Sequence, residues 1–190
     1  EGLVDFIKTL RHLSCGKPIG IKLCIGDPSE FNDLCVEMKR QNVFPDFLTI
    51  DGGEGGTGAA PPEFSNSIGM GLRDGLIIAN DYLMLHGIRD QVRLIASGKV
   101  VTGFDMVKVL ALGADACYSA RAMMLALGCI QALECNKNKC PTGVATQRPD
   151  LYKGLDVEDK YVRVANYHQG TLESVAEILC AAGISDIKHL

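Results

Sequence analysis

The chain has 190 residues, of which 47% are hydrophobic and 22% charged, and its formal net charge is −4 at pH 7. This composition is typical of a globular protein that is long enough to bury one substantial core. The mild acidity argues against a nucleic-acid partner, because such proteins usually present a basic patch. No apolar run reaches the roughly 18 residues of a membrane-spanning helix, so we expect no membrane span.

The predicted elements alternate between short apolar strands and amphipathic helices. The chain begins at Glu1 and not Met, directly on a helical pattern over 2–11, so we expect a piece of a longer protein. Strands are then predicted at 18–24, 46–51, 92–96 and 115–118. Helices are predicted at 28–42, 72–86, 103–113 and 120–127. The tail over 150–190 has a helical pattern with mixed charge, which we expect to pack as support.

About four consecutive strand–helix units predict a parallel α/β fold, namely half of a TIM (β/α)8 barrel. Polar and glycine-rich residues cluster just after each strand, on the face that carries the chemistry in such barrels. A lone half barrel has two open edges, which again favours a fragment. We therefore expect a half barrel over 1–128, a cysteine loop over 129–148 and a helical extension over 149–190.

Three loops after predicted strands are candidate ligand sites. The densest glycine run, 52–58, follows the strand that ends at Asp51, and its backbone can approach a flat or anionic ligand closely. Asp51 and Thr57 favour a ligand there. The segments Ser97-Gly98-Lys99 and Ser119-Ala-Arg121 follow the last two strands, where barrels commonly bind a phosphate at a helix N-terminus.

Lys22 stands within the first strand, between Ile21 and Leu23. A lysine there is expected to point into the barrel mouth or to lie at an exposed edge. A buried cation is costly without a partner, so Lys22 favours an anionic or electron-rich ligand.

Three cysteines, Cys129, Cys135 and Cys140, form the pattern C-x5-C-x4-C. Thiolates this close in sequence can hold a soft metal centre. Structural zinc uses four ligands, whereas a cuboidal cluster that has lost one iron needs three. The other five cysteines are expected to be buried reduced thiols, which favours a cytoplasmic location: Cys15, Cys24, Cys35, Cys117 and Cys180.

Lys22 and three segments together resemble the FMN-binding synthase domain of glutamate synthase: DGGEGGTGAAP over 51–61, SGKVVTG over 97–103, and 128–147, which ends in CPTGVATQ. The resemblance runs from about residue 17 to 148, and the cysteine stretch is its most specific part. It implies an enzyme that holds FMN beside a [3Fe-4S] cluster. Such enzymes transfer hydride to the imine formed from 2-oxoglutarate and ammonia, giving glutamate.

The resemblance also implies roles for particular residues. Cys129, Cys135 and Cys140 would ligate the cluster, and Lys22 would lie near the flavin and the substrate carboxylates, with Glu54 as a second catalytic residue. The implied cofactor-binding residues, besides Lys22, are Gly53, Gly55, Gly56, Ser97, Gly98, Lys99, Ser119 and Arg121. The implied partners are an electron donor protein or reductase subunit and the remainder of the barrel.

The chain departs from the family in one loop, where Gly53-Glu54 stands in place of a common histidine–aspartate pair. No amidotransferase domain is present in these residues. Three alternatives stay open. The enzyme uses another amine such as methylamine, or the chain is an inactive fragment whose cysteines bind zinc or nothing, or it is an IMP dehydrogenase-like enzyme with Cys140 as its catalytic cysteine.

Overall fold

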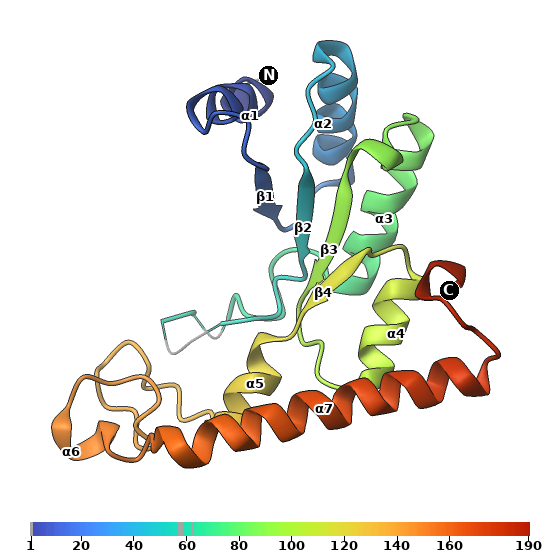
Figure 1. Ribbon diagram of the computed structural model, residues 1–190. Coiled ribbons are helices and arrows are strands. Elements are labelled where there is room, and N and C mark those ends of the chain that lie inside the picture. Colours follow the sequence, from blue (N-terminus) through green and yellow to red (C-terminus); the bar gives the residue numbers. More distant parts are fainter. Residues whose placement is uncertain (1, 57–58, 62) are drawn as a thin grey trace. The chain divides into compact units, whose positions relative to one another are not determined.

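The computed structural model in Figure 1 describes residues 2–56, 59–61 and 63–190. Expectations about Glu1, Thr57 and Gly58 therefore lie outside the described residues. The chain divides into two compact units. The first consists of the segments up to Gly53, Ile68–Gly98 and Val109–Tyr118, and the second of Glu54–Ser67, Lys99–Lys108 and Ser119–Leu190.

The predicted alternation of strands and helices is confirmed, and no boundary of a predicted strand or of a helix up to 127 is wrong by more than two residues. The strands are β1 (Gly20–Leu23), β2 (Phe47–Asp51), β3 (Arg93–Ser97) and β4 (Ala116–Tyr118). The helices are α1 (Gly2–Leu13), α2 (Pro28–Gln41), α3 (Leu72–Leu85), α4 (Gly103–Ala111), α5 (Ala120–Leu127), α6 (Pro149–Tyr152) and α7 (Val157–Ala181). Short 3₁₀ turns at Arg89–Gln91 and Ile187–His189 were not predicted.

In the first unit, the described strands form one parallel sheet in the order β1-β2-β3-β4. The order follows the sequence without a reversal. A doubly wound sheet reverses its strand order at a switch point, whereas a barrel adds each strand beside the preceding one. The topology therefore agrees with the predicted barrel units.

The two faces of this sheet differ in chemistry. Side chains alternate along a strand, and those of Leu48, Ile50 and Leu94 are fully buried on one face. Helix α3 packs against this face, where an atom added at Gly75 would lie 3.4 Å from Ile50. Helix α2 contacts α3, and α1 contacts α2 (Figure 1). The opposite face carries Lys22 and, in register with it, Thr49.

Helix α2 shows how local chemistry sets an element boundary. Asp27 caps its first turn, since its Oδ1 accepts the Ser29 N–H at 2.8 Å, and Pro28 occupies the first helical position. At the other end Asn42 adopts a left-handed conformation with φ of 53°. The predicted start, with an acidic cap followed by proline, is therefore confirmed.

In the second unit, the long helix α7 packs against α5 (Figure 1). The Tyr167 hydroxyl of α7 donates to the Val101 carbonyl, and a side chain at Gly103 would meet Ser174 of α7. The helical pattern of the tail corresponds to α6 and to α7, which is 25 residues long. Among the residues that the structure describes, no helix combines the length and the apolarity that crossing a membrane requires.

The expectation of buried thiols is wrong for three of the five scattered cysteines. Cys35 is buried and Cys117 is half-buried, but Cys15, Cys24 and Cys180 are exposed. Cys15 follows α1 in a turn with φ of 55°, and turn residues lie at the surface. All eight cysteines are free thiols in the structure, including the five for which reduced thiols were predicted.

A polar network joins the amino-terminal ends of β3 and β4. Arg89 donates to the carbonyls of Val92 and Gly113 at 2.9 and 2.8 Å, and to Asp115 Oδ2 at 2.9 Å. Asp115 also accepts the Leu94 N–H at 2.8 Å. Both partners of this ion pair are largely covered, so loss of the Arg89 donors would leave partly buried acceptors poorly satisfied.

We predict that Arg89→Ala lowers the free energy of unfolding by about 2–3 kcal/mol, because it removes the side-chain donor to the Val92 and Gly113 carbonyls and one of the donors to Asp115. Arg93→Ala is the matched control. Its guanidinium pairs with the same Asp115 but is 68% exposed, so the expected loss is below about 0.5 kcal/mol. Urea unfolding followed by circular dichroism measures both, and equal losses would contradict the assignment.

Asp105 caps the start of α4 together with Thr102. Its Oδ2 accepts the Thr102 N–H at 3.0 Å, and its own N–H donates to Thr102 Oγ1 at 3.1 Å. Burial raises the pKa of Asp105, but hydrogen bonds from Lys108, Thr102 and Val101 outweigh it and lower the pKa from 3.8 to about 2.

We predict that Asp105→Ala lowers the free energy of unfolding by roughly 2 kcal/mol at neutral pH. Since the folded pKa is depressed, the contribution is fully present above pH 4 and is lost as pH falls through about 2. Unfolding curves of both proteins between pH 7 and 2 test this. A difference that does not change with pH would contradict it.

Candidate functional site

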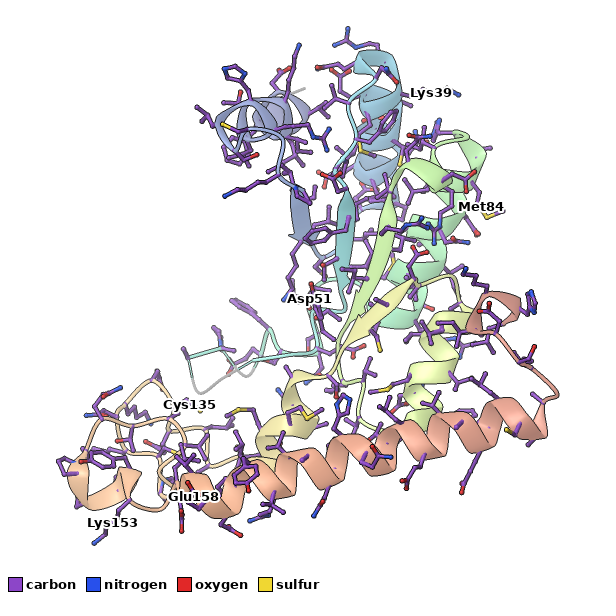
Figure 2. All side chains as sticks on the ribbon, viewed as in Figure 1. Lys39, Asp51, Met84, Cys135, Lys153 and Glu158 are labelled. Atoms are coloured by element: carbon purple, nitrogen blue, oxygen red, sulfur yellow. The ribbon has the colours of Figure 1, made fainter. Side chains whose placement is uncertain are left out.

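In the first unit, the polar residues predicted from sequence gather at the carboxyl ends of the strands, on the face turned away from the helices. Asp51 ends β2 and Ser97 ends β3, and the two are direct register partners (Figure 2 labels Asp51). Ser97 is in turn paired with Tyr118 at the end of β4. Lys22, on β1, pairs with Thr49, which lies two residues before Asp51 on β2.

Lys22 forms an ion pair that the sequence analysis did not assign. Its Nζ lies 2.6 Å from Asp51 Oδ2, with the lysine side chain 57% exposed and the aspartate 26%. The other oxygen, Oδ1, accepts the N–H of Gly53 at 2.9 Å. The Lys22 ammonium therefore lies at the carboxyl edge of the sheet and is exposed to solvent.

The glycines of the run differ in why the structure favours glycine at their positions. Gly52 is buried, and a Cβ there would lie 2.6 Å from the backbone nitrogen of Leu72, so close packing of α3 requires glycine. Gly53 follows with φ of 62°, a left-handed conformation that glycine adopts readily. Further along, Glu54 is half-buried, whereas Gly55 and Gly56 are exposed.

In the second unit, both predicted phosphate-binding cations contact the loop over 54–67. The Lys99 ammonium donates to Asn66 Oδ1, and both residues adopt left-handed backbones, with φ of 47° and 67°. Arg121 Nη2 donates to the Gly56 carbonyl at 3.1 Å. The sequence analysis missed Asn66, and its only signal was that asparagine tolerates this conformation.

The start of α5 fits an anion. Ser119 occupies the N-cap position, but its hydroxyl donates to the Val100 carbonyl at 2.9 Å instead of capping the helix. The first-turn N–H groups thus have no side-chain cap, and Arg121 lies in the same turn. N–H groups, the helix dipole and a cation together suit a phosphate. The remaining residue predicted there, Gly98, follows β3 in the first unit.

The cysteine loop follows α5 directly, after Gly128 ends the helix with φ of 103°. The Gln131 N–H donates to Cys129 Sγ at 3.4 Å, whereas Cys135 is half-buried in the loop (Figure 2). Cys140 is buried, with its sulfur 3.4 Å from Thr142 Oγ1.

Hydrogen bonds favour the thiolate form of Cys140. Burial raises the pKa of the thiol, but hydrogen bonds from Thr142 and from the N–H groups of Ala145 and Val144 lower it to about 7. N–H donors aimed at sulfur are the surroundings in which thiolates ligate metal clusters. The surroundings of Cys140 therefore suit a metal-bound thiolate, but within the described residues the structure does not bring Cys129, Cys135 and Cys140 together as a metal site.

Side chains within the loop are held by Asn138, which the sequence analysis did not single out. Its Oδ1 accepts the Gln147 N–H at 2.6 Å and the Thr146 hydroxyl at 2.9 Å. Gly143 has φ of 77°, and a Cβ there would lie 2.4 Å from the Leu151 carbonyl, which explains the glycine in CPTG. Among described residues, no three His, Cys, Asp or Glu side chains gather closely enough to hold a metal ion.

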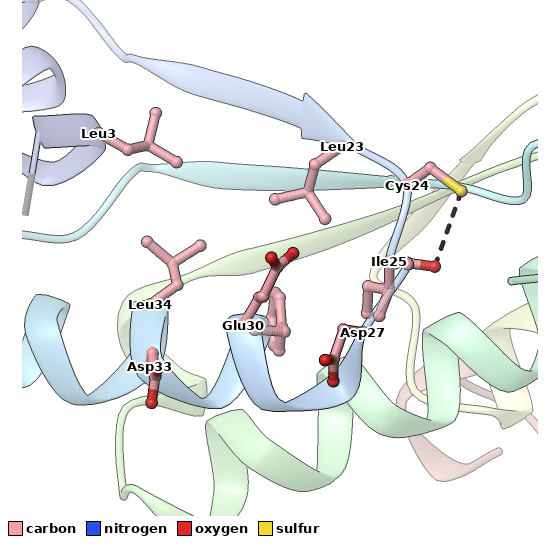
Figure 3. A pocket seen from close by; sticks show the side chains of 10 residues that line it. Leu3, Leu23, Cys24, Ile25, Asp27, Glu30, Asp33 and Leu34 are labelled. Atoms are coloured by element: carbon pink, nitrogen blue, oxygen red, sulfur yellow. Dashed lines mark hydrogen bonds between the residues drawn. The ribbon is translucent and has the colours of Figure 1, made fainter. Parts of the chain in front are cut away.

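Each unit contains a hollow. A cavity of about 360 Å³ in the first unit is lined by Leu23, Phe31 and Glu30 among others (Figure 3). A more apolar hollow of about 690 Å³ in the second unit is lined by Leu127 and by residues of α7 such as Tyr161. The residues that line them do not include the predicted ligands, so neither hollow corresponds to the predicted site.

Comparison with solved structures identifies the fold. Two variants of flavocytochrome b2, one with sulfite and one with benzoylformate bound, superpose with TM-scores of 0.53 and 0.55. They cover 96% and 97% of this chain, which matches 36% of each, at 15% and 14% identity. The parallel α/β fold therefore corresponds to part of a TIM barrel, as predicted.

Comparison of sequences identifies relatives over nearly the whole chain. A glutamate synthase large subunit-like protein of Bacillus subtilis is 44% identical over 98% of the chain. The archaeal glutamate synthase [NADPH] of Methanocaldococcus jannaschii is 35% identical over the full chain. The chain spans 35% and 37% of these two relatives, and 12% of the Bacillus subtilis glutamate synthase [NADPH] large chain, which is 38% identical.

The family model described as the conserved region in glutamate synthase matches residues 1–185. This match spans the parallel sheet with Lys22 and Asp51, the loops after β2, β3 and β4, and the cysteine loop. Together with the identity to curated relatives, it shows that the chain belongs to the glutamate synthase family.

Proposed function

We propose that this chain is part of a glutamate synthase-type oxidoreductase that forms glutamate from 2-oxoglutarate and ammonia, with FMN and a [3Fe-4S] cluster. The observation that carries the proposal is Lys22, a cation on the free face of a parallel sheet at its carboxyl edge. Barrel enzymes assemble their active sites at this edge. Membership of the family over residues 1–185 supports the same function.

The residues that would hold FMN are those assigned from the sequence. In the second unit, Lys99, Arg121 and the uncapped start of α5 would bind the phosphate, and Ser119 shapes that turn. In the first, Ser97, Gly98 and Gly53 lie at or beyond the strand ends, where a flat ring can approach the backbone. Gly55 and Gly56 are exposed and would add to the lining. Bound FMN supplies hydride transfer to the imine carbon.

Lys22 would bind a substrate carboxylate and place positive charge where negative charge develops during reduction. Glu54 is half-buried in the loop that follows β2. We assign it the second catalytic role, as a group that exchanges a proton with the amine nitrogen. Its position in the loop after β2 suits that role, because such loops supply catalytic groups in barrels.

Cys129, Cys135 and Cys140 would ligate the cluster, within a loop that we assign to residues 129–148. Their spacing and the hydrogen bonds to the sulfurs of Cys129 and Cys140 support this assignment. The cluster supplies electrons to the flavin when bound. The chain's own contribution is the N–H donors, which stabilise charge on sulfur.

Several wider features belong to the same proposal. An electron donor protein or reductase subunit would supply electrons, and the remainder of the barrel would complete the FMN site. A reducing, cytoplasmic location agrees with eight free thiols. Methylamine or another amine is the alternative to ammonia, since Gly53-Glu54 replaces the family's common pair in the loop that would face the amine.

We predict that anaerobically purified protein binds about three irons per chain. Cys135→Ser should abolish this binding, because the cluster needs all three thiolates as ligands. Iron and sulfide analysis with an ultraviolet–visible spectrum measures it. Cys180→Ser is the control, since this exposed cysteine lies in α7 outside the loop. The proposed function would be overturned by folded protein that lacks both iron and flavin and that forms no glutamate from 2-oxoglutarate with ammonium or methylamine.

We predict that Arg121→Ala weakens FMN binding about tenfold, since it removes a charge-assisted hydrogen bond to the phosphate. Lys188→Ala, at an exposed site near the end of the chain, should leave the affinity unchanged. Quenching of flavin fluorescence during titration measures Kd for both. If riboflavin, which lacks the phosphate, showed the same tenfold loss, Arg121 would not bind the phosphate.

A further inference from the structure

The carboxylate of Asp51 holds two groups of the candidate site at once. Oδ2 lies 2.6 Å from the Lys22 ammonium, and Oδ1 accepts the Gly53 N–H at 2.9 Å. One side chain therefore links the cation on β1 to the left-handed turn that follows β2.

Stability alone does not account for this pair. Lys22 is more than half exposed, and ion pairs at such positions contribute little to folding because water screens them. The pair stands on the face of the sheet opposite to the one that packs against α3, at the edge where barrels carry their chemistry. Its position therefore favours a role in holding Lys22 for a ligand.

We propose that Asp51 is the positioning residue for Lys22, an inference that rests on the proposed function for the identity of the ligand. A lysine ammonium has three donors. Asp51 takes one and fixes the long side chain, which leaves two donors for a ligand carboxylate arriving from a set direction. Fixing the side chain in advance avoids an entropy cost when the ligand binds.

Removal of Asp51 has two opposing effects on an anionic ligand. It increases the local positive charge, which attracts the anion, and it releases the Lys22 side chain, which must then be ordered on binding. Because Lys22 is exposed, water and salt weaken the first effect. The second effect is therefore expected to dominate.

The structure offers a closely matched control at the other end of the same strand. Asp46, just before β2, accepts the Ile19 N–H at 2.7 Å and pairs with Arg11 at 2.8 Å. It thus holds a backbone N–H and a cation as Asp51 does, but at the amino-terminal end. Asp46→Asn removes one negative charge, as Asp51→Asn does, but at a site distant from Lys22. Asp51→Asn retains an oxygen that can accept the Gly53 N–H. Asp51→Glu retains the negative charge.

The first measurement needs no cofactor: the rate at which an amine-acylating reagent labels Lys22, followed by peptide mass spectrometry. Pairing with Asp51 must open before acylation, so we expect Asp51→Asn to speed labelling severalfold. Asp51→Glu should restore most of the slow rate, and Asp46→Asn should leave it unchanged. Unchanged labelling in folded Asp51→Asn, or equal acceleration by Asp46→Asn, would overturn the proposal.

The second measurement is steady-state kinetics of the active protein with 2-oxoglutarate. We expect Asp51→Asn to raise KM about fivefold with a smaller change in kcat, since the lost feature is the preset position of Lys22. A fall in kcat alone would contradict positioning. If wild-type protein forms no glutamate, the proposed function fails, but labelling still decides whether Asp51 holds Lys22.

Discussion

The parallel pairing of β1, β2, β3 and β4 in sequence order is the constraint on which the first-unit site depends. Because every strand runs the same way and pairs with its predecessor, all carboxyl ends meet at one edge. Lys22, Asp51 and Ser97 are far apart in sequence, yet register brings them to that edge and to one face. Burial of Leu48, Ile50 and Leu94 on the other face prevents a slip of one residue, which would turn Lys22 toward the helices.

In the second unit, hydrogen bonds between side chains and backbone organise the functional loops, where regular structure is sparse. Asn138 ties two parts of the cysteine loop, and Lys99 and Arg121 contact the loop over 54–67. Loops of this kind adapt to a ligand more easily than strands do, because few buried apolar contacts hold them. A rigid sheet edge and hydrogen-bonded loops thus play different parts in the proposed site.

The success of the element predictions has a local cause. Hydrophobic period, caps such as Asp27 and turn glycines act within a few residues, so strands, helices and their order were predictable from sequence. The burial of individual cysteine side chains was not predictable in this way. Cys15 and Cys24 lie beyond the ends of elements, where exposure depends on what packs nearby, and both are exposed.

Motif spacing and periodicity are properties of the chain alone, so the family, the parallel α/β class and the candidate ligands could be predicted from them. The contacts of Asp51 with Lys22 and of Asn66 with Lys99 are visible only in the folded molecule. Each contact joins residues more than 25 positions apart. Such contacts depend on strand register and loop path, which arise from the packing of the whole unit and leave no periodic signal in the sequence.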